Sequence, residues 1–333
     1  MPNIIFNSNC NRRCVYCFAQ QKNEGDKREI SLDHLTTACD FLERSRIKSV
    51  NVLGGEPTLH SRFLLLFRYL VSRGFGITLF SNGMIAKPVL TGILEIIDEW
   101  GLTSHHLKIV VNVNEDKYRS PTERRLQKRT FEALHEHIGL SFNIFEKSCD
   151  MNFLVDLIDS HRLLPRIRLG LAAPIAGRKN RFLPMEDYGI IARKVVTLSD
   201  RCQAHGIDFG FDCGFPMCMF SDEDIGRLFK NMARLQFVCD PVLDIDPDLN
   251  VIYCYPLSGY HSLKLRDFNN VKEIYDEFAS LMGRDDRQRG IYAECAECPY
   301  LKSKRCAGGC KGFYLRTPGD TPTVAENRTI TTS

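Results

Sequence analysis

The sequence predicts an α/β protein in which a partial (β/α)6 barrel, similar to a TIM barrel, is followed by a small cysteine-rich domain. Two observations lead to this prediction. Short β-branched runs alternate six times with longer helical patterns up to about residue 210, which is typical of a parallel sheet covered by helices. Beyond that residue, Cys, Pro, Gly and Asp become frequent and helical periodicity mostly stops. A barrel is favoured over a Rossmann sheet because no glycine-rich dinucleotide fingerprint follows the first strand.

Each barrel strand is expected from a short apolar run, and each helix from apolar residues at helical spacing. The predicted strands are 3–9, 49–55, 76–83, 107–114, 140–146 and 166–174. The predicted helices are 31–45, 61–74, 87–101, 121–138, 152–162 and 185–205. Ser31 is a capping residue for the first helix, and Gly74 closes the second. The crossovers between parallel strands are expected to be right-handed.

The domain organisation follows from this pattern. Residues 1–210 are predicted to form the barrel, and residues 211–315 a smaller domain whose fold depends on bound clusters. Helices are expected at 221–235 and 271–283 in that domain. The tail 316–333 lacks apolar residues and is expected to be disordered.

Composition restricts the class of protein. Hydrophobic residues make up 44% and charged residues 26%, which is ordinary for a soluble globular protein. The net charge of +3 gives no argument for nucleic acid, so no such partner is expected. No apolar run is long enough to span a bilayer, and the N-terminus has no secretory signal. We therefore expect a cytoplasmic protein without membrane attachment.

Cysteine is unusually abundant, with 14 residues. In a reducing compartment, thiols are more often metal or cluster ligands than disulfides. Three lie within 10–17, and eight lie between 213 and 310. The isolated Cys39, Cys149 and Cys202 are interpreted as small buried hydrophobic residues.

The stretch "NSNCNRRCVYCFAQQ" places Cys10, Cys14 and Cys17 directly after the first predicted strand. The carboxyl ends of barrel strands carry the chemistry in parallel α/β barrels. Three thiolates can hold three irons of a [4Fe–4S] cube, which leaves the fourth iron open. An open coordination position is typical of a catalytic rather than a structural site.

At this point a family resemblance becomes specific. "CNRRCVYCF" resembles the CxxxCxxC signature of the radical S-adenosylmethionine (SAM) enzymes, with Tyr16 as the aromatic residue before the third Cys. "LGGEPTLH" (53–60) resembles the family's GGEP motif, and "LFSNGM" (79–84) its ribose-contacting segment. The resemblance implies that SAM chelates the open iron. It also implies that the reduced cluster cleaves SAM to methionine and a 5′-deoxyadenosyl radical, which abstracts a substrate hydrogen.

The resemblance also implies roles for the GGEP loop. Gly54 and Gly55 would let the backbone approach the SAM ammonium closely. Glu56 would add a charge-assisted interaction with that ammonium or would instead orient the loop. Pro57 would fix the turn.

Further SAM contacts are expected from later strand ends. Ser81 and Asn82 would bond the ribose hydroxyls. Asn112 and Asn114 are expected to alternate faces, so that only Asn112 points into the barrel; capping of the strand end is the alternative. The backbone of 171–177 would meet the adenine, by resemblance alone.

The C-terminal cysteines resemble those of a SPASM domain, which carries auxiliary [4Fe–4S] clusters. The resemblance lies in "CDPVLDIDPDLNVIYC" (239–254) and "CAECPYLKSKRCAGGC" (295–310). It implies that the auxiliary ligands are Cys239, Cys254, Cys295, Cys298, Cys306 and Cys310. A zinc ribbon is the alternative for the pair at 295 and 298.

The chain departs from the SPASM pattern in three ways. Leu249 stands where the family prefers Gly, the spacing from Cys298 to Cys306 is longer than usual, and no Cys follows Cys310. Cys213 and Cys218 bring the candidates to eight, enough for two four-thiol clusters. The alternative is that these two cysteines line the barrel mouth.

The leading functional interpretation is a radical SAM–SPASM enzyme that crosslinks, epimerises or oxidises a peptide or protein side chain. A small-molecule dehydrogenase or rearrangement enzyme with one auxiliary cluster is the first alternative. A non-catalytic electron-transfer or regulatory protein is the second, and the GGEP and SNG motifs argue against it. An electron donor such as flavodoxin or ferredoxin is expected.

Two further features bear on partners. The sequence opens on the first barrel strand, so no leader-peptide recognition domain is expected before it, which weakens the peptide interpretation. The basic segments 124–129 and 177–181 are interpreted as solvated surface, with an acidic partner or a reductase docking site as the alternative.

Overall fold

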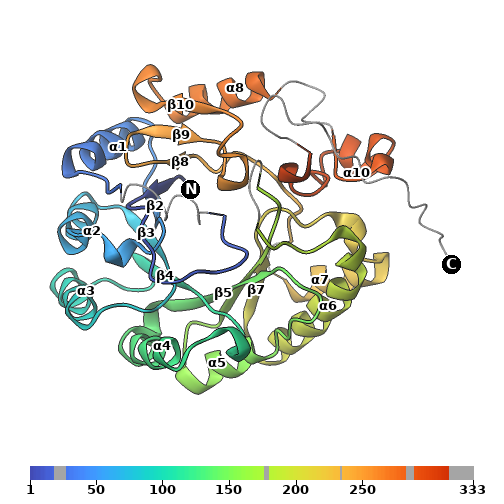
Figure 1. Cartoon of the computed structure of the whole chain (residues 1–333), viewed down its shortest axis with the longest axis horizontal. Helices are drawn as coiled ribbons and strands as arrows, with labels where there is room; N and C mark the ends of the chain where they lie inside the picture. The colour runs from blue at the N-terminus through green and yellow to red at the C-terminus, as the bar shows by residue number, and fades with distance from the viewer. Residues whose placement is uncertain (19–27, 176–179, 233–234, 283–288, 315–333) are drawn as a thin grey trace.

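The protein is described by a computed structural model that covers residues 1–18, 28–175, 180–232, 235–282 and 289–314. Its strands form one ten-stranded sheet in the order β10-β9-β8-β1-β2-β3-β4-β5-β6-β7. Figure 1 shows helices α1 to α6 as an outer ring around the barrel strands. The two edge strands, β10 and β7, do not pair with each other, so the barrel is partial. The predicted fold class is confirmed.

Seven parallel strands build the barrel, and all their carboxyl ends lie at one end of it. They are β1 (Asn3–Ile5), β2 (Ser49–Leu53), β3 (Gly76–Ser81), β4 (Leu107–Asn112), β5 (Ile138–Ile144), β6 (Arg166–Leu171) and β7 (Asp208–Phe211). The loops after β1, β2, β3 and β4 therefore meet, and these loops carry the predicted site residues.

All six predicted barrel helices are present. They are α1 (Leu32–Arg44), α2 (Phe63–Ser72), α3 (Lys87–Trp100), α4 (Pro121–Leu134), α5 (Phe153–His161) and α6 (Tyr188–Ala204). Side-chain caps start several of them: Ser31 accepts a hydrogen bond from the backbone of His34, and Ser120 accepts one from Glu123. Such caps satisfy amide groups that a helix start leaves unpaired.

The outer and inner faces of the barrel strands differ in burial. β2 alternates half-buried and buried residues, and its fully buried Val50 and Val52 belong to the same core as Leu66 and Phe67 of α2. Because side chains alternate faces along a strand, the half-buried residues face the inside of the barrel. The inner face is therefore the one that a ligand can reach.

The cysteine-rich segment is joined to this sheet. β8 (Asp244–Ile245) pairs in parallel with β1, and β9 (Asn250–Ile252) and β10 (Ser262–Lys264) extend it antiparallel. The helices predicted there are α7 (Asp222–Asn231) and α8 (Val271–Leu281), followed by the short α10 (Pro299–Lys302). The boundary predicted at residue 210 falls inside β7, and the division into two domains stays a prediction. The predicted disordered tail, 316–333, lies outside the described residues.

Leu249 lies in the turn between β8 and β9 with a φ of 60°. This left-handed conformation favours glycine, because a side chain there is crowded by the following carbonyl. The backbone thus explains why Gly is preferred at this position and why Leu is unusual.

Candidate functional site

The three N-terminal cysteines lie on the loop that follows β1, and each is half-buried. The backbone amide of Cys17 donates to the carbonyl of Cys14 at 3.0 Å, which closes a turn between them. Burial raises the pKa of Cys10 from 9.0 to about 11. A thiol in this environment ionises readily only when a cation binds it, which suits a cluster ligand.

Arg12 anchors this loop to the barrel wall. Its guanidinium donates to the carbonyl of Asn112 at 2.9 Å and forms an ion pair with Glu123 in the first turn of α4. The two side chains are only 7% and 8% exposed. The loop that carries the cysteines is therefore held by a buried ion pair that sequence analysis did not find.

Tyr16 contacts the end of β4. Its ring stacks on Phe145 with centroids 4.9 Å apart, and its hydroxyl lies 2.9 Å from Oδ1 of Asn112 and 2.6 Å from Oδ1 of Asn114. The expectation that only Asn112 points inward is wrong. Residues two apart share a face of an extended chain, so both asparagines reach the same hydroxyl.

The GGEP loop after β2 packs directly on the loop after β1. The amide of Gly55 donates to the carbonyl of Asn7 at 3.0 Å, and the amide of Glu56 donates to that of Asn9 at 2.6 Å. A Cβ atom at Gly54 would lie 2.5 Å from the carbonyl oxygen of Asn7. Gly54 is therefore needed for close approach of the two loops.

Glu56 is fully buried, and protein groups occupy both of its carboxylate oxygens. Oε1 accepts from the Thr58 amide and hydroxyl at 3.3 and 2.6 Å and from the Ser81 hydroxyl at 3.0 Å. Oε2 accepts from the amide of Asn82 at 2.7 Å. Burial raises the pKa of Glu56, and these hydrogen bonds oppose the rise. This geometry favours loop orientation over direct contact with an ammonium. Pro57 begins the short 3-10 turn Pro57–Leu59, which Glu56 caps.

The SNG segment after β3 contacts the cysteine loop. The side-chain amide of Asn82 donates to Oδ1 of Asn11 at 2.7 Å and lies 3.8 Å from Sγ of Cys10. Its Oδ1 accepts from the amide of Met84 at 2.8 Å. Three motifs far apart in the sequence thus form one bonded unit at the carboxyl end of the barrel. Part of the predicted adenine segment, residues 176 and 177, lies outside the described residues.

Comparison with known families agrees with this geometry. Residues 4–144 match the profile of the Radical SAM superfamily, and this range contains all three motifs. This part of the chain is therefore similar to the Radical SAM superfamily.

Similar proteins extend the comparison. The mycofactocin maturase MftC of Mycolicibacterium smegmatis is 34% identical over 89 residues, which are 27% of this chain and 22% of that protein. A SAM-dependent nucleotide dehydratase of Selenomonas ruminantium is 31% identical over 84 residues, 25% of this chain and 30% of that protein. The matched segments thus span less than a third of these relatives.

Two solved structures share the fold. Streptococcus suis SuiB bound to S-adenosylmethionine superposes with a TM-score of 0.63 at 17% identity, over 93% of this chain and 72% of that one. Native anSMEcpe with bound AdoMet superposes with a TM-score of 0.65 at 14% identity, over 96% of this chain and 92% of that one. The likeness of fold covers the cysteine-rich segment as well as residues 4–144.

The pKa shifts of the C-terminal thiols indicate two groups, because the thiols that affect one another fall into two sets. In the first thiol group (Cys213, Cys239, Cys254 and Cys310), burial raises the pKa of Cys213, and the charges of Asp212 and the three other thiols raise it further. Burial likewise raises the pKa of Cys254, with Cys239 and Cys310 adding to it. A Cβ atom at Gly214 would lie 3.4 Å from Cβ of Cys310, so the loop after β7 touches the C-terminal segment.

The second thiol group comprises Cys218, Cys295, Cys298 and Cys306. Although the Cys218 residue is exposed, desolvation of its thiol raises its pKa to about 12, and Cys295, Cys306 and Cys298 add to the rise. The amide of Met217 lies 3.4 Å from Sγ of Cys306. After burial, the thiols that chiefly raise the pKa of Cys213, Cys218, Cys254, Cys295 and Cys310 each belong to the same group as the cysteine they affect.

Each thiol group suits a polynuclear cluster in its chemistry. Within the described ranges, no three His, Cys, Asp or Glu side chains converge as a single metal ion requires. Four thiolates are the donor set that a [4Fe–4S] cube requires, one for each iron. Cys39, Cys149 and Cys202 differ: each is buried, its pKa is raised to about 12 by burial, and no other thiol contributes.

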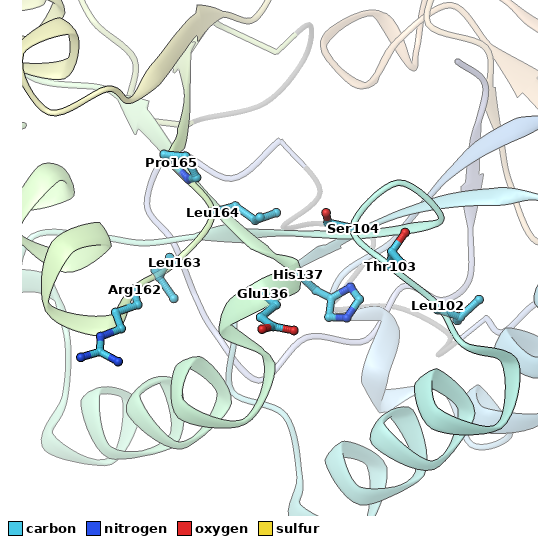
Figure 2. Close-up of a pocket in the computed structure, with 9 residues that line it drawn as sticks. All are labelled: Leu102, Thr103, Ser104, Glu136, His137, Arg162, Leu163, Leu164 and Pro165. Carbon is cyan, nitrogen blue, oxygen red and sulfur yellow. The ribbon is translucent and has the colours of Figure 1, made fainter.

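A cavity of about 420 Å³ lies at the other end of the barrel (Figure 2). It is formed by the loops that enter β4, β5 and β6, and its lining includes Ser104, His137 and Arg162. None of the predicted site residues lines it. His137 contacts the carbonyl of Leu107 at 3.0 Å, so its ring already has a structural partner. Chemistry in such barrels belongs to the opposite end.

No helix among the described residues is both long and apolar enough to cross a membrane.

Proposed function

We propose that this protein is a radical SAM enzyme that cleaves SAM reductively at a [4Fe–4S] cluster held by Cys10, Cys14 and Cys17. The main support is the bonded unit of three motif loops within residues 4–144, which match the Radical SAM superfamily. When bound, the reduced cluster and SAM supply a 5′-deoxyadenosyl radical that abstracts a substrate hydrogen.

The chain's own residues would bind SAM and orient it. The backbone of Gly55 and its neighbours would face the SAM ammonium, with Glu56 holding that loop against β3. Asn82 and Ser81 would contact the ribose. Asn112, held by the Tyr16 hydroxyl, would lie on the inner face beside the cofactor.

We further infer two auxiliary [4Fe–4S] clusters, one for each thiol group. Two features support this inference: each group has four members, and burial raises the pKa of Cys213 in one group and of Cys218 in the other. Cys213 and Cys218 would supply the fourth ligands. They would compensate for the cysteine missing after Cys310. Two auxiliary clusters are therefore inferred instead of one.

The inferred substrate is a peptide or protein side chain, which the enzyme would crosslink, epimerise or oxidise. This inference rests on relatives named as maturases and on the shared fold with SuiB, which has also been solved bound to its precursor peptide SuiA. The similarity to a nucleotide dehydratase supports the small-molecule alternative. A flavodoxin or ferredoxin as electron donor and a cytoplasmic location stay predictions.

The substrate class can be tested with the reconstituted holoenzyme, dithionite and SAM. One arm adds the short peptide encoded nearest to the gene, and the other adds a nucleotide panel. We expect 5′-deoxyadenosine to rise with the peptide, together with a change in its mass or, in D₂O, in its deuterium content. If 5′-deoxyadenosine rises with a nucleotide and not with the peptide, the result would contradict the peptide proposal and support the small-molecule alternative.

A further inference from the structure

Helix α4 turns an unusually polar face toward the barrel. Five of its side chains are buried, and three of the five are polar: Glu123, Gln127 and Thr130. A helix normally packs apolar side chains against a core, and a buried polar side chain costs free energy unless it is hydrogen-bonded. The ion pair with Arg12 satisfies Glu123. Gln127 and Thr130, which are both fully buried, need partners of their own.

The partners of these two side chains are backbone carbonyls of the SNG segment. The side-chain amide of Gln127 donates to the carbonyl of Asn82 at 2.7 Å, and the hydroxyl of Thr130 donates to the carbonyl of Gly83 at 2.8 Å. The pairing of β3 with β4 extends only as far as Ser81, so both carbonyls lie beyond the ladder. Buried backbone carbonyls require a partner, and α4 supplies one to each.

Arg119, which precedes α4, fixes the orientation of the Gln127 amide. Its guanidinium donates to Oε1 of Gln127 at 3.2 Å, and the Arg119 side chain is only 9% exposed. A guanidinium has donors and no acceptor, so Oε1 of Gln127 must face Arg119 and Nε2 must face Asn82. The Gln127 side chain therefore cannot turn over without losing both hydrogen bonds.

Gly83 allows α4 to approach the SNG segment this closely. Its φ is 77°, in the left-handed region that favours glycine. A Cβ atom there would lie 2.9 Å from Cγ1 of Val111 and 3.3 Å from Cγ of Gln127. The glycine of the SNG segment is thus required by its own conformation and by the closeness of α4.

The backbone of Asn82 is held on both sides of its Cα atom. Its amide donates to Oε2 of Glu56 at 2.7 Å, and its carbonyl accepts from Gln127. Its side chain reaches Oδ1 of Asn11 on the cysteine loop at 2.7 Å. Because the backbone sets the direction of the Cα–Cβ bond, the two backbone hydrogen bonds determine where the Asn82 side chain points.

We propose that Gln127 and Thr130 are positioning residues for SAM, which fix the SNG backbone so that the Asn82 side chain meets the ribose hydroxyls. This inference rests on the proposed function, in which Asn82 contacts the ribose. A segment that is already ordered loses less conformational entropy when a ligand binds, so SAM binds more tightly. The benefit is the same for bound SAM and for the transition state. Its loss should therefore raise KM for SAM and leave kcat nearly unchanged.

Gln127→Glu and Thr130→Val test the proposal. The first keeps the size of the side chain and the acceptor for Arg119, but it removes the donor to the Asn82 carbonyl. The second keeps the shape and removes only the hydroxyl, whereas Thr130→Ser retains the hydroxyl. The reconstituted full chain is dialysed to equilibrium against radiolabelled SAM, and iron is counted in the same samples. KM for SAM and kcat are measured by uncoupled 5′-deoxyadenosine formation.

We expect the Kd of SAM to rise about tenfold in Gln127→Glu and in Thr130→Val, which is the effect of about one hydrogen bond. Thr130→Ser should bind SAM nearly as tightly as the natural sequence. Iron should stay at about 12 per chain in every variant, four for each cluster. An unchanged Kd in Gln127→Glu or in Thr130→Val would remove that residue from the positioning role.

Asn231→Asp is the matched control, because it makes the same change from amide to carboxylate. The Asn231 amide, at the end of α7, donates to the Ser199 hydroxyl at 3.1 Å and to the Asp200 carboxylate at 2.8 Å. α7 packs on α6, which lies two helices further round the barrel than α4 (Figure 1). We expect lower thermal stability in this variant and an unchanged Kd of SAM.

Two results would show that the loss of affinity is general destabilisation and would overturn the proposal. One is an equal rise of the Kd in Asn231→Asp, and the other is an equal rise in Thr130→Ser. If Gln127→Glu does not fold, the contrast between Thr130→Val and Thr130→Ser decides the role of the α4 face. A natural sequence that holds its clusters and binds no SAM would instead refute the proposed function, and the positioning role with it.

Discussion

Glu56 is the residue whose environment most changes the interpretation of the site. A carboxylate in a GGEP motif suggests a partner for the SAM ammonium, but here it accepts hydrogen bonds from Thr58, Ser81 and the amide of Asn82. These donors come from two different strand ends. Glu56 therefore fixes the GGEP loop relative to the SNG segment, and its effect on SAM passes through that geometry.

Glu56→Gln should therefore weaken stability and SAM binding together. In Gln, an NH₂ group replaces one of the two carboxylate oxygens that accept hydrogen bonds. At least one buried donor therefore loses its acceptor, at a cost of about 1–3 kcal/mol. Thermal unfolding and SAM affinity would be measured on the reconstituted protein, with Glu99→Gln, half exposed on α3, as the control. Lower SAM affinity with unchanged stability would instead indicate direct contact with the ammonium.

The asparagines at the end of β4 show where residue-level prediction failed. The motif order and the strand ends were predictable because each motif is short and local. The facing of Asn112 and Asn114 was predicted wrongly, since positions two apart share a face. The partner of both, the Tyr16 hydroxyl, lies almost a hundred residues away, and no local pattern indicates it.

At the scale of elements, the cysteine loop depends on α4. Arg12 reaches from that loop to Glu123, which stands in the first turn of α4 and is buried with it. A buried ion pair adds little net stability, but breaking it leaves an uncompensated buried charge. The pair therefore acts as a specific link between the loop after β1 and the helix after β4.

Replacing one partner of the Arg12–Glu123 ion pair should lower the free energy of unfolding more than replacing both. We expect Glu123→Gln to lower the free energy of unfolding by about 3 kcal/mol, because Arg12 stays buried and charged. The double variant Arg12→Met with Glu123→Leu should recover a large part of this loss. Chemical denaturation of all variants completes the cycle; additive losses would show that the pair is not coupled.

Element prediction succeeded where the pattern was long. Six strands and six helices were predicted from periodicities that extend over several residues, and all are present. β7 was missed because "DFGF" has only four residues and contains a glycine. β8 has two residues, too few to show an alternation, so its pairing with β1 follows only from the tertiary fold.

At the scale of the whole molecule, the two thiol groups join distant segments. Cys213 and Cys218 follow β7, whereas their group partners lie between residues 239 and 310. The eight candidate cysteines are recognisable in the sequence, but their division into two groups is not. The division depends on which thiols the fold brings together, and spacing along the chain does not encode it.

The division predicts how iron is lost. Three clusters correspond to about 12 iron per chain, and Cys213→Ala or Cys254→Ala should each remove about 4. Because both belong to the first thiol group, the double variant should also lose only about 4. Cys213→Ala combined with Cys218→Ala should lose about 8, and Cys39→Ala should lose none. Equal losses for the two double variants would contradict the grouping.

The central claim is that the Cys10, Cys14 and Cys17 loop holds the cluster at which SAM is cleaved. The most direct measurement is formation of 5′-deoxyadenosine by the anaerobically reconstituted full chain with dithionite and SAM, without any substrate. We expect slow uncoupled cleavage by the natural sequence. We expect none by the chain with all three cysteines changed to Ala, which should still retain about 8 iron in its auxiliary clusters. Cleavage that persists in this variant would show that SAM is not cleaved at a cluster held by Cys10, Cys14 and Cys17.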